Sequence, residues 1–376
     1  MTTQTLVPLD LPLPADDDRS ARAASLRSRH HVQRGDRDAW LALFTEDAIA
    51  ADPQAMAGAP TLPYLLKILA IEQPLSLQVH PSAEQAREGF AEEEARGINR
   101  TAFGRTFRDD RHKPEMVVAL TPMRLLVGFR PPEDLARDLV AIGADELVPL
   151  VEGATSYFSY VKEVLDGGSH PRALAALART PQDETSLGAA AHNARTFPGD
   201  PGALVALAMN SVTLGEGESR YVPPGTIHAY QSGVGLEIMA NSDNVVRGGL
   251  TAKAVDLRHL EAIMDGTPQA PQQPEVSRSG GATTYRAPVP EFTLTVIDGG
   301  EAVAASGPRI VLALAPTRVD HAAGSERLAP GAAIFVAAAD GPVTVASRGV
   351  AVIAAQGDAA PNSLPDAGAG AAPRLT

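Results

Sequence analysis

The octapeptide Pro74-Leu75-Ser76-Leu77-Gln78-Val79-His80-Pro81 decides the fold and the chemistry that we expect for this chain. Its middle alternates between apolar and polar residues, as a strand does when it buries one face only. The polar face carries a hydroxyl, an amide and an imidazole, from Ser76, Gln78 and His80. Such a face lines either a polar cavity or the wet side of an edge strand. The octapeptide alone does not choose between them, so the rest of the chain must.

The bulk composition limits the class of protein. The 376 residues are 44% hydrophobic, which is enough for two or three domains with apolar cores. There is no cysteine, so any metal must be bound by histidine, carboxylate or amide oxygen. The formal net charge of -13 argues against nucleic acid or an anionic membrane as a partner. With no secretory signal in Met1–Leu13 and no apolar run that could span a bilayer, we expect a soluble, cytoplasmic protein. We also expect it to be a monomer.

A second segment has the spacing of a known β-barrel motif. The pattern Gly217-x5-Pro223-x-Gly225-x2-His228 matches the second half of the cupin signature. In that signature glycine and proline form a tight turn, and the histidine enters a small β-barrel as a metal ligand. Tyr230 follows His228 at a spacing of two and therefore shares its face.

Two further predicted strands present charged side chains. Glu115 stands at the start of an apolar strand, and Pro114 forces an extended backbone just before it. Lys113 therefore lies on the same face as Glu115. Glu237 interrupts the apolar strand Leu236–Ala240.

Together these segments supply one amide oxygen, two imidazoles and one carboxylate, from Gln78, His80, Glu115 and His228. This donor set suits Zn²⁺ with positions left for water or substrate. Glu84 is a competing carboxylate, because His80-x3-Glu84 also has a spacing common in cupin metal sites. We rank Glu84 lower because a helix starting at Ser82 turns its side chain away from the strand face.

Four motifs of the chain resemble those of type I phosphomannose isomerases, over residues 61–260. They are Leu75–Pro81, His112–Glu115, Phe197–Gly202 ahead of Met209-Asn210, and His228–Thr251. The resemblance implies a zinc-dependent isomerase that interconverts mannose 6-phosphate and fructose 6-phosphate and feeds GDP-mannose synthesis. Its partner would be a phosphorylated hexose.

The same resemblance implies a role for individual residues. Gln78, His80, Glu115 and His228 match the zinc ligands, and Arg247 matches the catalytic arginine. Ser76 and Lys253 match positions that contact phosphate, and we add Tyr230 to the substrate-binding residues. Lys113 and Glu237 match active-site positions. The exchange moves a proton between C1 and C2 through a cis-enediol, and the base is Lys113, Glu237 or a zinc-bound water.

The expected fold is mainly β with a helical insertion. We expect a cupin-type (jelly-roll) β-barrel from residues 61–130 and 208–264, with an α-helical insertion over 131–207. A second, degenerate cupin-like β domain is expected over 279–357, after a Pro/Gln-rich linker.

Residues 1–60 look atypical. They lack the opening strands usual in the family, so we expect them to lie outside it, partly disordered and with one helix. Apolar residues at helical spacing place that helix at Asp36–Ala50, which resembles the opening helix of an NTF2-like domain.

Two other functions stay open at this point. One is a different cupin metalloenzyme, such as an iron or manganese oxygenase, although Gln78 in place of a histidine disfavours redox chemistry. The other is a folded but inactive protein that binds sugar phosphates.

Overall fold

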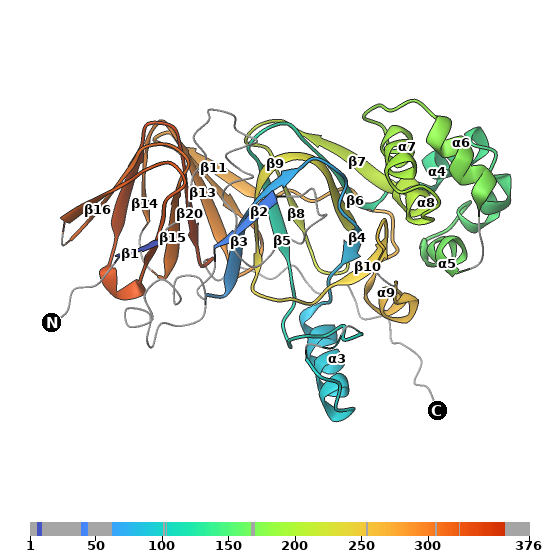
Figure 1. Cartoon of the computed structure of the whole chain (residues 1–376), viewed down its shortest axis with the longest axis horizontal. Helices are drawn as coiled ribbons and strands as arrows, with labels where there is room; N and C mark the ends of the chain where they lie inside the picture. The colour runs from blue at the N-terminus through green and yellow to red at the C-terminus, as the bar shows by residue number, and fades with distance from the viewer. Residues whose placement is uncertain are drawn as a thin grey trace.

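The computed structural model describes residues 6–9, 39–43, 62–100, 102, 104–166, 170–252, 255–304, 307–322 and 324–357. Figure 1 shows three parts in a row, with C-terminal β-sheets on the left, a curled central sheet, and a group of helices on the right. Within the described ranges, no helix has the length and apolar character needed to cross a membrane.

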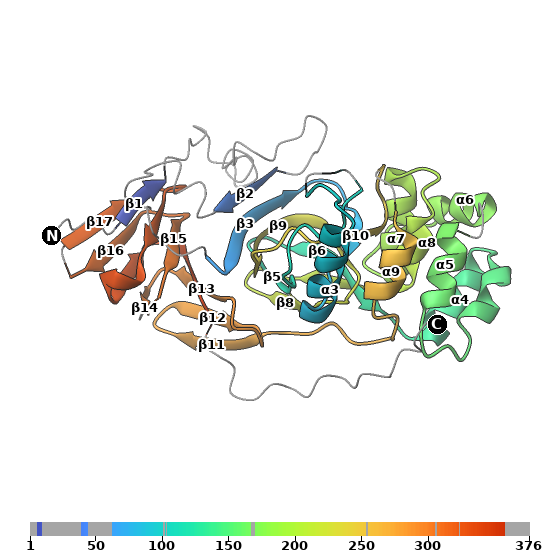
Figure 2. The ribbon, with the colours of Figure 1, turned by 90° about the horizontal axis from the view of Figure 1, so that it is seen from below.

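The central sheet holds nine strands. These are β2 (Ala39–Leu43), β3 (Tyr64–Ile71), β4 (Leu77–Val79), β5 (Glu115–Ala119), β6 (Met123–Phe129), β7 (Met209–Leu214), β8 (Ser219–Val222), β9 (His228–Ala240) and β10 (Val246–Gly249). All of their pairings are antiparallel, and in Figure 2 the strands curl around a shared interior.

Strand β9 joins the two halves of this sheet. Its first half pairs with β4 and β6, and its second half pairs with β3 and β5. The change of partners falls at Gly233, which has a φ of +103°. A Cβ there would lie 2.4 Å from the carbonyl oxygen of Pro122, so only glycine fits. One strand therefore carries both His228 and Glu237.

Helices occupy the excursion between β6 and β7. They are α4 (Pro132–Ala141), the 3₁₀ helix η1 (Asp145–Leu150), α5 (Phe158–Asp166), α6 (Pro171–Arg179), α7 (Ser186–Thr196) and α8 (Gly202–Leu207). Among the described residues, two more α-helices lie elsewhere: α3 (Ala83–Ala95), which begins at a Ser82 capping box, and α9 (Leu257–Ile263).

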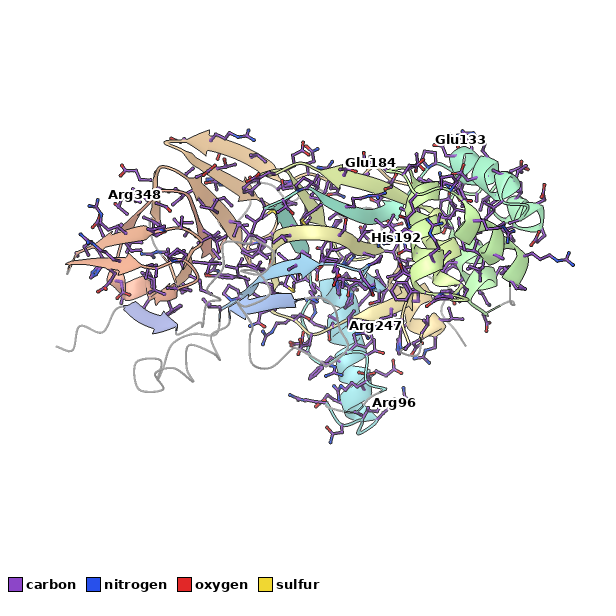
Figure 3. The ribbon with its side chains drawn as sticks, turned by 45° about the horizontal axis from the view of Figure 1, so that its top comes forward. Arg96, Glu133, Glu184, His192, Arg247 and Arg348 are labelled. Carbon is purple, nitrogen blue, oxygen red and sulfur yellow. The ribbon has the colours of Figure 1, made fainter. Side chains whose placement is uncertain are left out.

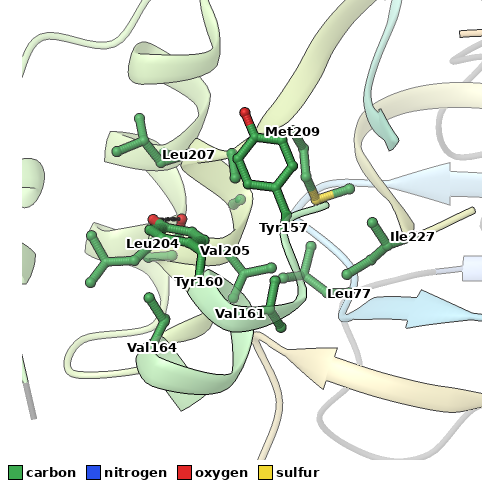
Figure 4. Close-up of a cluster of buried hydrophobic side chains, with 14 of the residues drawn as sticks. Leu77, Tyr157, Tyr160, Val161, Val164, Leu204, Val205, Leu207, Met209 and Ile227 are labelled. Atoms are coloured by element: carbon green, nitrogen blue, oxygen red, sulfur yellow. Dashed lines mark hydrogen bonds between the residues drawn. The ribbon is translucent and has the colours of Figure 1, made fainter. Parts of the chain in front are cut away.

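The helices share a core with the central sheet. In Figure 4, Leu77 of β4 and Ile227, just ahead of β9, pack in one cluster with residues of α5 and α8. The Tyr160 hydroxyl of α5 donates to the carbonyl oxygen of Leu204 in α8 at 2.8 Å. Because Leu77 and Ile227 are neighbours of Gln78 and His228, this packing fixes the backbone of two predicted ligand positions.

The C-terminal part consists of two further sheets. Its strands are β11 (Glu275–Ser279), β12 (Ala282–Arg286), β13 (Thr293–Asp298), β14 (Glu301–Ala304), β15 (Arg309–Ala313), β16 (Thr317–His321), β17 (Gly324–Leu328), β18 (Ala333–Val336), β19 (Val343–Ser347) and β20 (Val350–Ala355), with the 3₁₀ helix η2 (Ala338–Asp340). A buried apolar cluster spans this part and the central sheet. The Tyr64 hydroxyl of β3 donates to the carbonyl oxygen of Ala354 at 2.8 Å.

The N-terminal segment differs from the expectation. We predicted a helix at Asp36–Ala50, and this prediction is wrong for Ala39–Leu43. These residues form β2, and each of them pairs with a residue of β3. The reason is non-local, because β3 has a free edge whose backbone groups need partners. Another strand, β1 (Leu6–Leu9), pairs with β18, within a tail for which we predicted no strand.

Candidate metal centre and active site

Three of the predicted ligands meet in the interior of the central sheet. His80 follows β4, Glu115 begins β5, and His228 begins β9. Their side chains are 2%, 1% and 0% exposed, and their ligand atoms all lie within 4.8 Å of one another. His80 Nε2 lies 3.1 Å from Glu115 Oε1, and His228 Nε2 lies 3.1 Å from Glu115 Oε2.

The outward nitrogens of both histidines are bound to carbonyl groups. His80 Nδ1 lies 2.7 Å from the carbonyl oxygen of Asn244, and His228 Nδ1 lies 2.9 Å from that of Thr226. A carbonyl only accepts hydrogen bonds, so each Nδ1 carries a proton and donates it. When such a ring is neutral, the inward-facing Nε2 carries no proton and presents its lone pair.

The electrostatics of the cluster fit a bound cation. Burial, and secondarily the charge of Lys113, lowers the pKa of His80 to about 4, so its ring is neutral at physiological pH. Burial opposes ionisation of Glu115, but its neighbours, led by His80 and Lys113, outweigh burial and hold its pKa well below the usual range. His80 Nε2 is buried and has no hydrogen-bond partner among the described residues. A lone pair facing a carboxylate is unfavourable alone and favourable around a metal ion.

Gln78 lies beside this cluster in the strand register. On β4 it stands opposite His228 of β9 on one side and Arg247 of β10 on the other. Burial, and secondarily the charge of Arg108, lowers the pKa of Arg247, although an arginine stays charged. No described carboxylate forms an ion pair with Arg247. Figure 3 shows this side chain on the side of the sheet from which α3 projects.

A second set of polar side chains lies next to the cluster. Lys113 Nζ is 3.2 Å from Glu115 Oε1. The Tyr230 hydroxyl donates to Glu115 Oε2 at 3.4 Å and is buried. Lys67 Nζ is 3.2 Å from Glu237 Oε2, and the two residues face each other in the β3–β9 register. Burial, only partly offset by Lys67, raises the pKa of Glu237.

The remaining predicted residues are less defined. Ser76 is half-buried and precedes β4 by one residue, so it lies outside the strand that we expected to contain it. Lys253 lies outside the described residues. Glu84 belongs to the first turn of α3 and is exposed, whereas Glu115 occupies the carboxylate position between the two histidines.

Sequence reasoning missed Lys67, which was given no role, although its side chain is only 16% exposed and pairs with Glu237. The sequence does contain a hint of this role. Lys67 interrupts a short, otherwise apolar run, Tyr64–Ile71, of the kind that forms a buried strand. A lysine in the middle of a buried strand requires a partner. That partner, Glu237, lies 170 positions further along the chain and is identified only by strand pairing.

Comparisons with known proteins agree with this geometry. A family model described as the catalytic domain of type I phosphomannose isomerase matches residues 28–132. Mannose-6-phosphate isomerase of Escherichia coli (strain K12) is 32% identical over 324 residues, which cover 81% of this chain and 83% of the relative. The enzyme of Salmonella typhimurium is 35% identical over 269 residues, covering 67% and 68%.

Solved structures give the same result. A zinc-bound mannose 6-phosphate isomerase superposes with a TM-score of 0.73 at 30% identity, covering 83% of this chain and 85% of the other. A structure of the Salmonella typhimurium enzyme with fructose 6-phosphate and zinc bound has the same values. The mainly β, cupin-type fold expected from the sequence is thereby confirmed.

One expectation about the N-terminus is corrected. The family match begins at residue 28, within the segment 1–60 that we placed outside the family, so that prediction is wrong for residues 28–60. The chain is about one third identical to the Escherichia coli enzyme over most of both chains, matches the catalytic-domain model and has the same fold as the solved enzymes. It therefore belongs to the type I phosphomannose isomerase family.

Proposed function

We propose that this chain is a zinc-dependent isomerase that interconverts mannose 6-phosphate and fructose 6-phosphate through a cis-enediol. The observation that carries the proposal is the buried cluster of His80, Glu115 and His228, in which the Nε2 atoms of two imidazoles face the two oxygens of one carboxylate. The relatives that share the fold bear this enzyme name, and one was solved with zinc and fructose 6-phosphate.

The zinc ligands that we propose are His80, Glu115, His228 and the amide oxygen of Gln78. Bound zinc supplies a Lewis acid for the sugar oxygens at C1 and C2. The carbonyl groups of Asn244 and Thr226 keep both rings turned with Nε2 inward. Tyr230 donates to Glu115 from a buried position, so we propose that it orients this carboxylate and does not contact substrate directly.

Proton transfer requires a group that removes a proton from one carbon and returns it to the neighbouring carbon. We propose that Lys113 and the Lys67–Glu237 pair do this, because these titratable groups lie beside the cluster with little exposure: the side chains of Lys113, Lys67 and Glu237 are 12%, 16% and 5% exposed. They stand on β3, on β9 and just before β5, and these strands are neighbours because β9 pairs with both β3 and β5. Lys67 holds the Glu237 carboxylate in place, and the pair can share a proton.

Substrate binding is the third part of the proposal. Arg247 has no carboxylate partner among the described residues and is half-buried, which suits a guanidinium that stabilises the negative charge of an enediolate. Ser76 precedes Gln78 by two residues and can contact the phosphate group together with Lys253.

The proposal extends to organisation and setting. We propose that 61–130 and 208–264 form the catalytic domain, supported by the helical unit 131–207 and the C-terminal unit 279–357. We further propose that the enzyme works in the cytoplasm, as a monomer, and supplies mannose 6-phosphate for GDP-mannose synthesis. A charged hexose phosphate cannot cross a membrane unaided, which supports a shared compartment for these steps.

A coupled assay tests the proposal. Zinc-loaded protein is expected to convert mannose 6-phosphate to fructose 6-phosphate, and Glu115→Ala is expected to lose both zinc and turnover. Stoichiometric iron in place of zinc would favour an oxygenase instead. A folded, zinc-loaded sample with no turnover would contradict the proposal.

A further inference from the structure

We propose that Asn244 is a positioning residue that sets the zinc affinity of the metal centre. It holds the ring of His80 and the backbone segment that leads to Glu115 in one hydrogen-bonded unit. The inference rests on the proposed function only in one respect: it assumes that the ion bound by His80, Glu115 and His228 is zinc.

The side chain of Asn244 is fully buried and its hydrogen-bonding capacity is used up. Its Oδ1 accepts from the backbone N–H groups of Arg108, at 2.7 Å, and Asp109, at 3.3 Å. Its Nδ2 donates to the carbonyl oxygens of Asp109, at 2.8 Å, and Arg111, at 2.9 Å. An amide with two donor hydrogens and an acceptor oxygen is the group that can bridge backbone groups of both kinds. These partners all belong to the segment Arg108–Arg111, as does Asp109 Oδ1, which Nδ2 contacts at 3.3 Å.

That segment leads directly into the metal centre. Four residues after Arg111 comes Glu115, with Lys113 between them. The segment has no regular secondary structure, so its conformation depends on side-chain contacts such as those of Asn244. If it moves, Glu115 moves relative to the histidines.

The backbone of Asn244 reaches a second ligand. Its carbonyl oxygen accepts from His80 Nδ1 at 2.7 Å. This bond fixes the tautomer and the orientation of the ring that must present Nε2 to the metal. One residue thus touches the ring of one predicted ligand and the backbone that leads to another. It also stands three positions before Arg247 on the way into β10.

Neighbouring residues close the network. The Ser242 hydroxyl donates to Asp109 Oδ1 at 2.8 Å and accepts from the Asn244 N–H at 3.2 Å. The Asp243 N–H donates to Asp109 Oδ2 at 2.8 Å. Truncating Asn244 leaves several backbone groups without their partner, and the ligand-bearing segment can then rearrange.

Zinc affinity measured on the full chain tests the inference. In competition with a chromophoric chelator, Asn244→Ala is expected to bind zinc about 10–100-fold more weakly than the wild type. Ser242→Ala removes only the hydroxyl contacts and is expected to weaken zinc binding in the same direction by a smaller factor. Asn241→Ala is the matched control, since its amide lies in the same loop but donates to the Leu62 carbonyl. Its zinc affinity is expected to match the wild type.

Two results would overturn the inference. One is a folded Asn244→Ala protein with wild-type zinc affinity. If that variant does not fold, Ser242→Ala decides, and unchanged zinc affinity there would equally overturn it. A purely structural role would lower the melting temperature of Asn244→Ala without changing its affinity for zinc. Failure of the wild-type chain to bind zinc would overturn the proposed function together with this inference.

Discussion

Lys67 and Glu237 face each other from β3 and β9, with nitrogen and oxygen 3.2 Å apart and side chains only 16% and 5% exposed. A charged pair this deep costs desolvation free energy, and apolar residues would stabilise the sheet at least as well. The proposed role in proton transfer would account for such a pair beside a predicted metal centre.

The substitution Lys67→Met tests that role, because methionine keeps much of the stem but removes the charge. Turnover is expected to fall about 10²–10⁴-fold, as for loss of a proton-transfer group, while zinc content stays at that of the wild type. The coupled assay and metal analysis measure both. Lys162→Met, on the exposed face of α5, is the control and should remain fully active. A Lys67→Met enzyme within a few-fold of wild-type turnover would contradict the role.

Arg247→Ala separates substrate chemistry from metal binding. The guanidinium is proposed to stabilise charge on the enediolate, so turnover should drop about 10²–10³-fold with zinc content unchanged. Arg96→Ala is the control, since Arg96 is an exposed arginine of the α3 C-terminus and is labelled with Arg247 in Figure 3. Loss of zinc from the Arg247→Ala protein would show that this arginine supports the metal centre instead.

Much of the site could be predicted residue by residue. Local backbone preferences predict three features: the alternation around His80, the turn before His228 and the extended Lys113–Glu115 segment. The structure brings the three side chains concerned, of His80, Glu115 and His228, together. Their role as zinc ligands stays a prediction. Lys67 and Asn244 were missed because their importance lies in partners far along the chain, and a single sequence does not show strand register.

Among the elements, β2 is the least expected. Apolar residues in Ala39–Leu43 occur at a spacing that suits either a helix or a short strand, and periodicity cannot separate these over five residues. Pairing with the free edge of β3 decides for the strand. Similarly, no local pattern marks β10 as a strand, because its residues Val-Arg-Gly-Gly do not alternate, and its pairing with β4 decides. Helix α7 lies within the expected helical insertion, although its alanines give little contrast between its faces.

Two truncations test the part played by β2. Both remove β1, but deletion through residue 38 keeps β2, whereas deletion through residue 43 exposes the outer edge of β3. An exposed edge strand pairs with other chains, so the longer deletion should self-associate in analytical ultracentrifugation. Both deletions expose the edge of β18 alike, so the shorter one is the matched control and should self-associate less than the longer one. Equal behaviour of the two would show that β2 does not protect β3.

At the scale of the whole molecule, a shared apolar cluster joins the central and C-terminal sheets. A polar contact accompanies it, because His112 Nε2 lies 2.6 Å from Glu291 Oε1 beside a cavity of about 460 Å³. Burial opposes ionisation of Glu291, but the hydrogen bond and charge of His112 outweigh burial and lower the pKa of Glu291 below its ordinary value. The pair therefore ties the two sheets together most strongly when Glu291 is ionised.

This lowered pKa gives a prediction with a definite sign. The pair stabilises the fold above the pKa of Glu291 in the unfolded chain, and this stabilisation is lost as the pH falls through the lower folded value. Urea unfolding of chelator-treated protein should show Glu291→Gln less stable than the wild type by on the order of 1 kcal/mol near pH 6. That difference should shrink progressively below about pH 4.5. A difference independent of pH would contradict the assignment.

Zinc titration of the chelator-treated full chain tests the central claim most directly. Turnover of mannose 6-phosphate should be absent without metal, rise in proportion to added zinc, and stop rising at one zinc per chain. In the same titration, His228→Ala should show no such break, because it lacks one of the three buried ligands. Full turnover without zinc, or no turnover at saturating zinc, would contradict the claim that this cluster forms the active site of the enzyme.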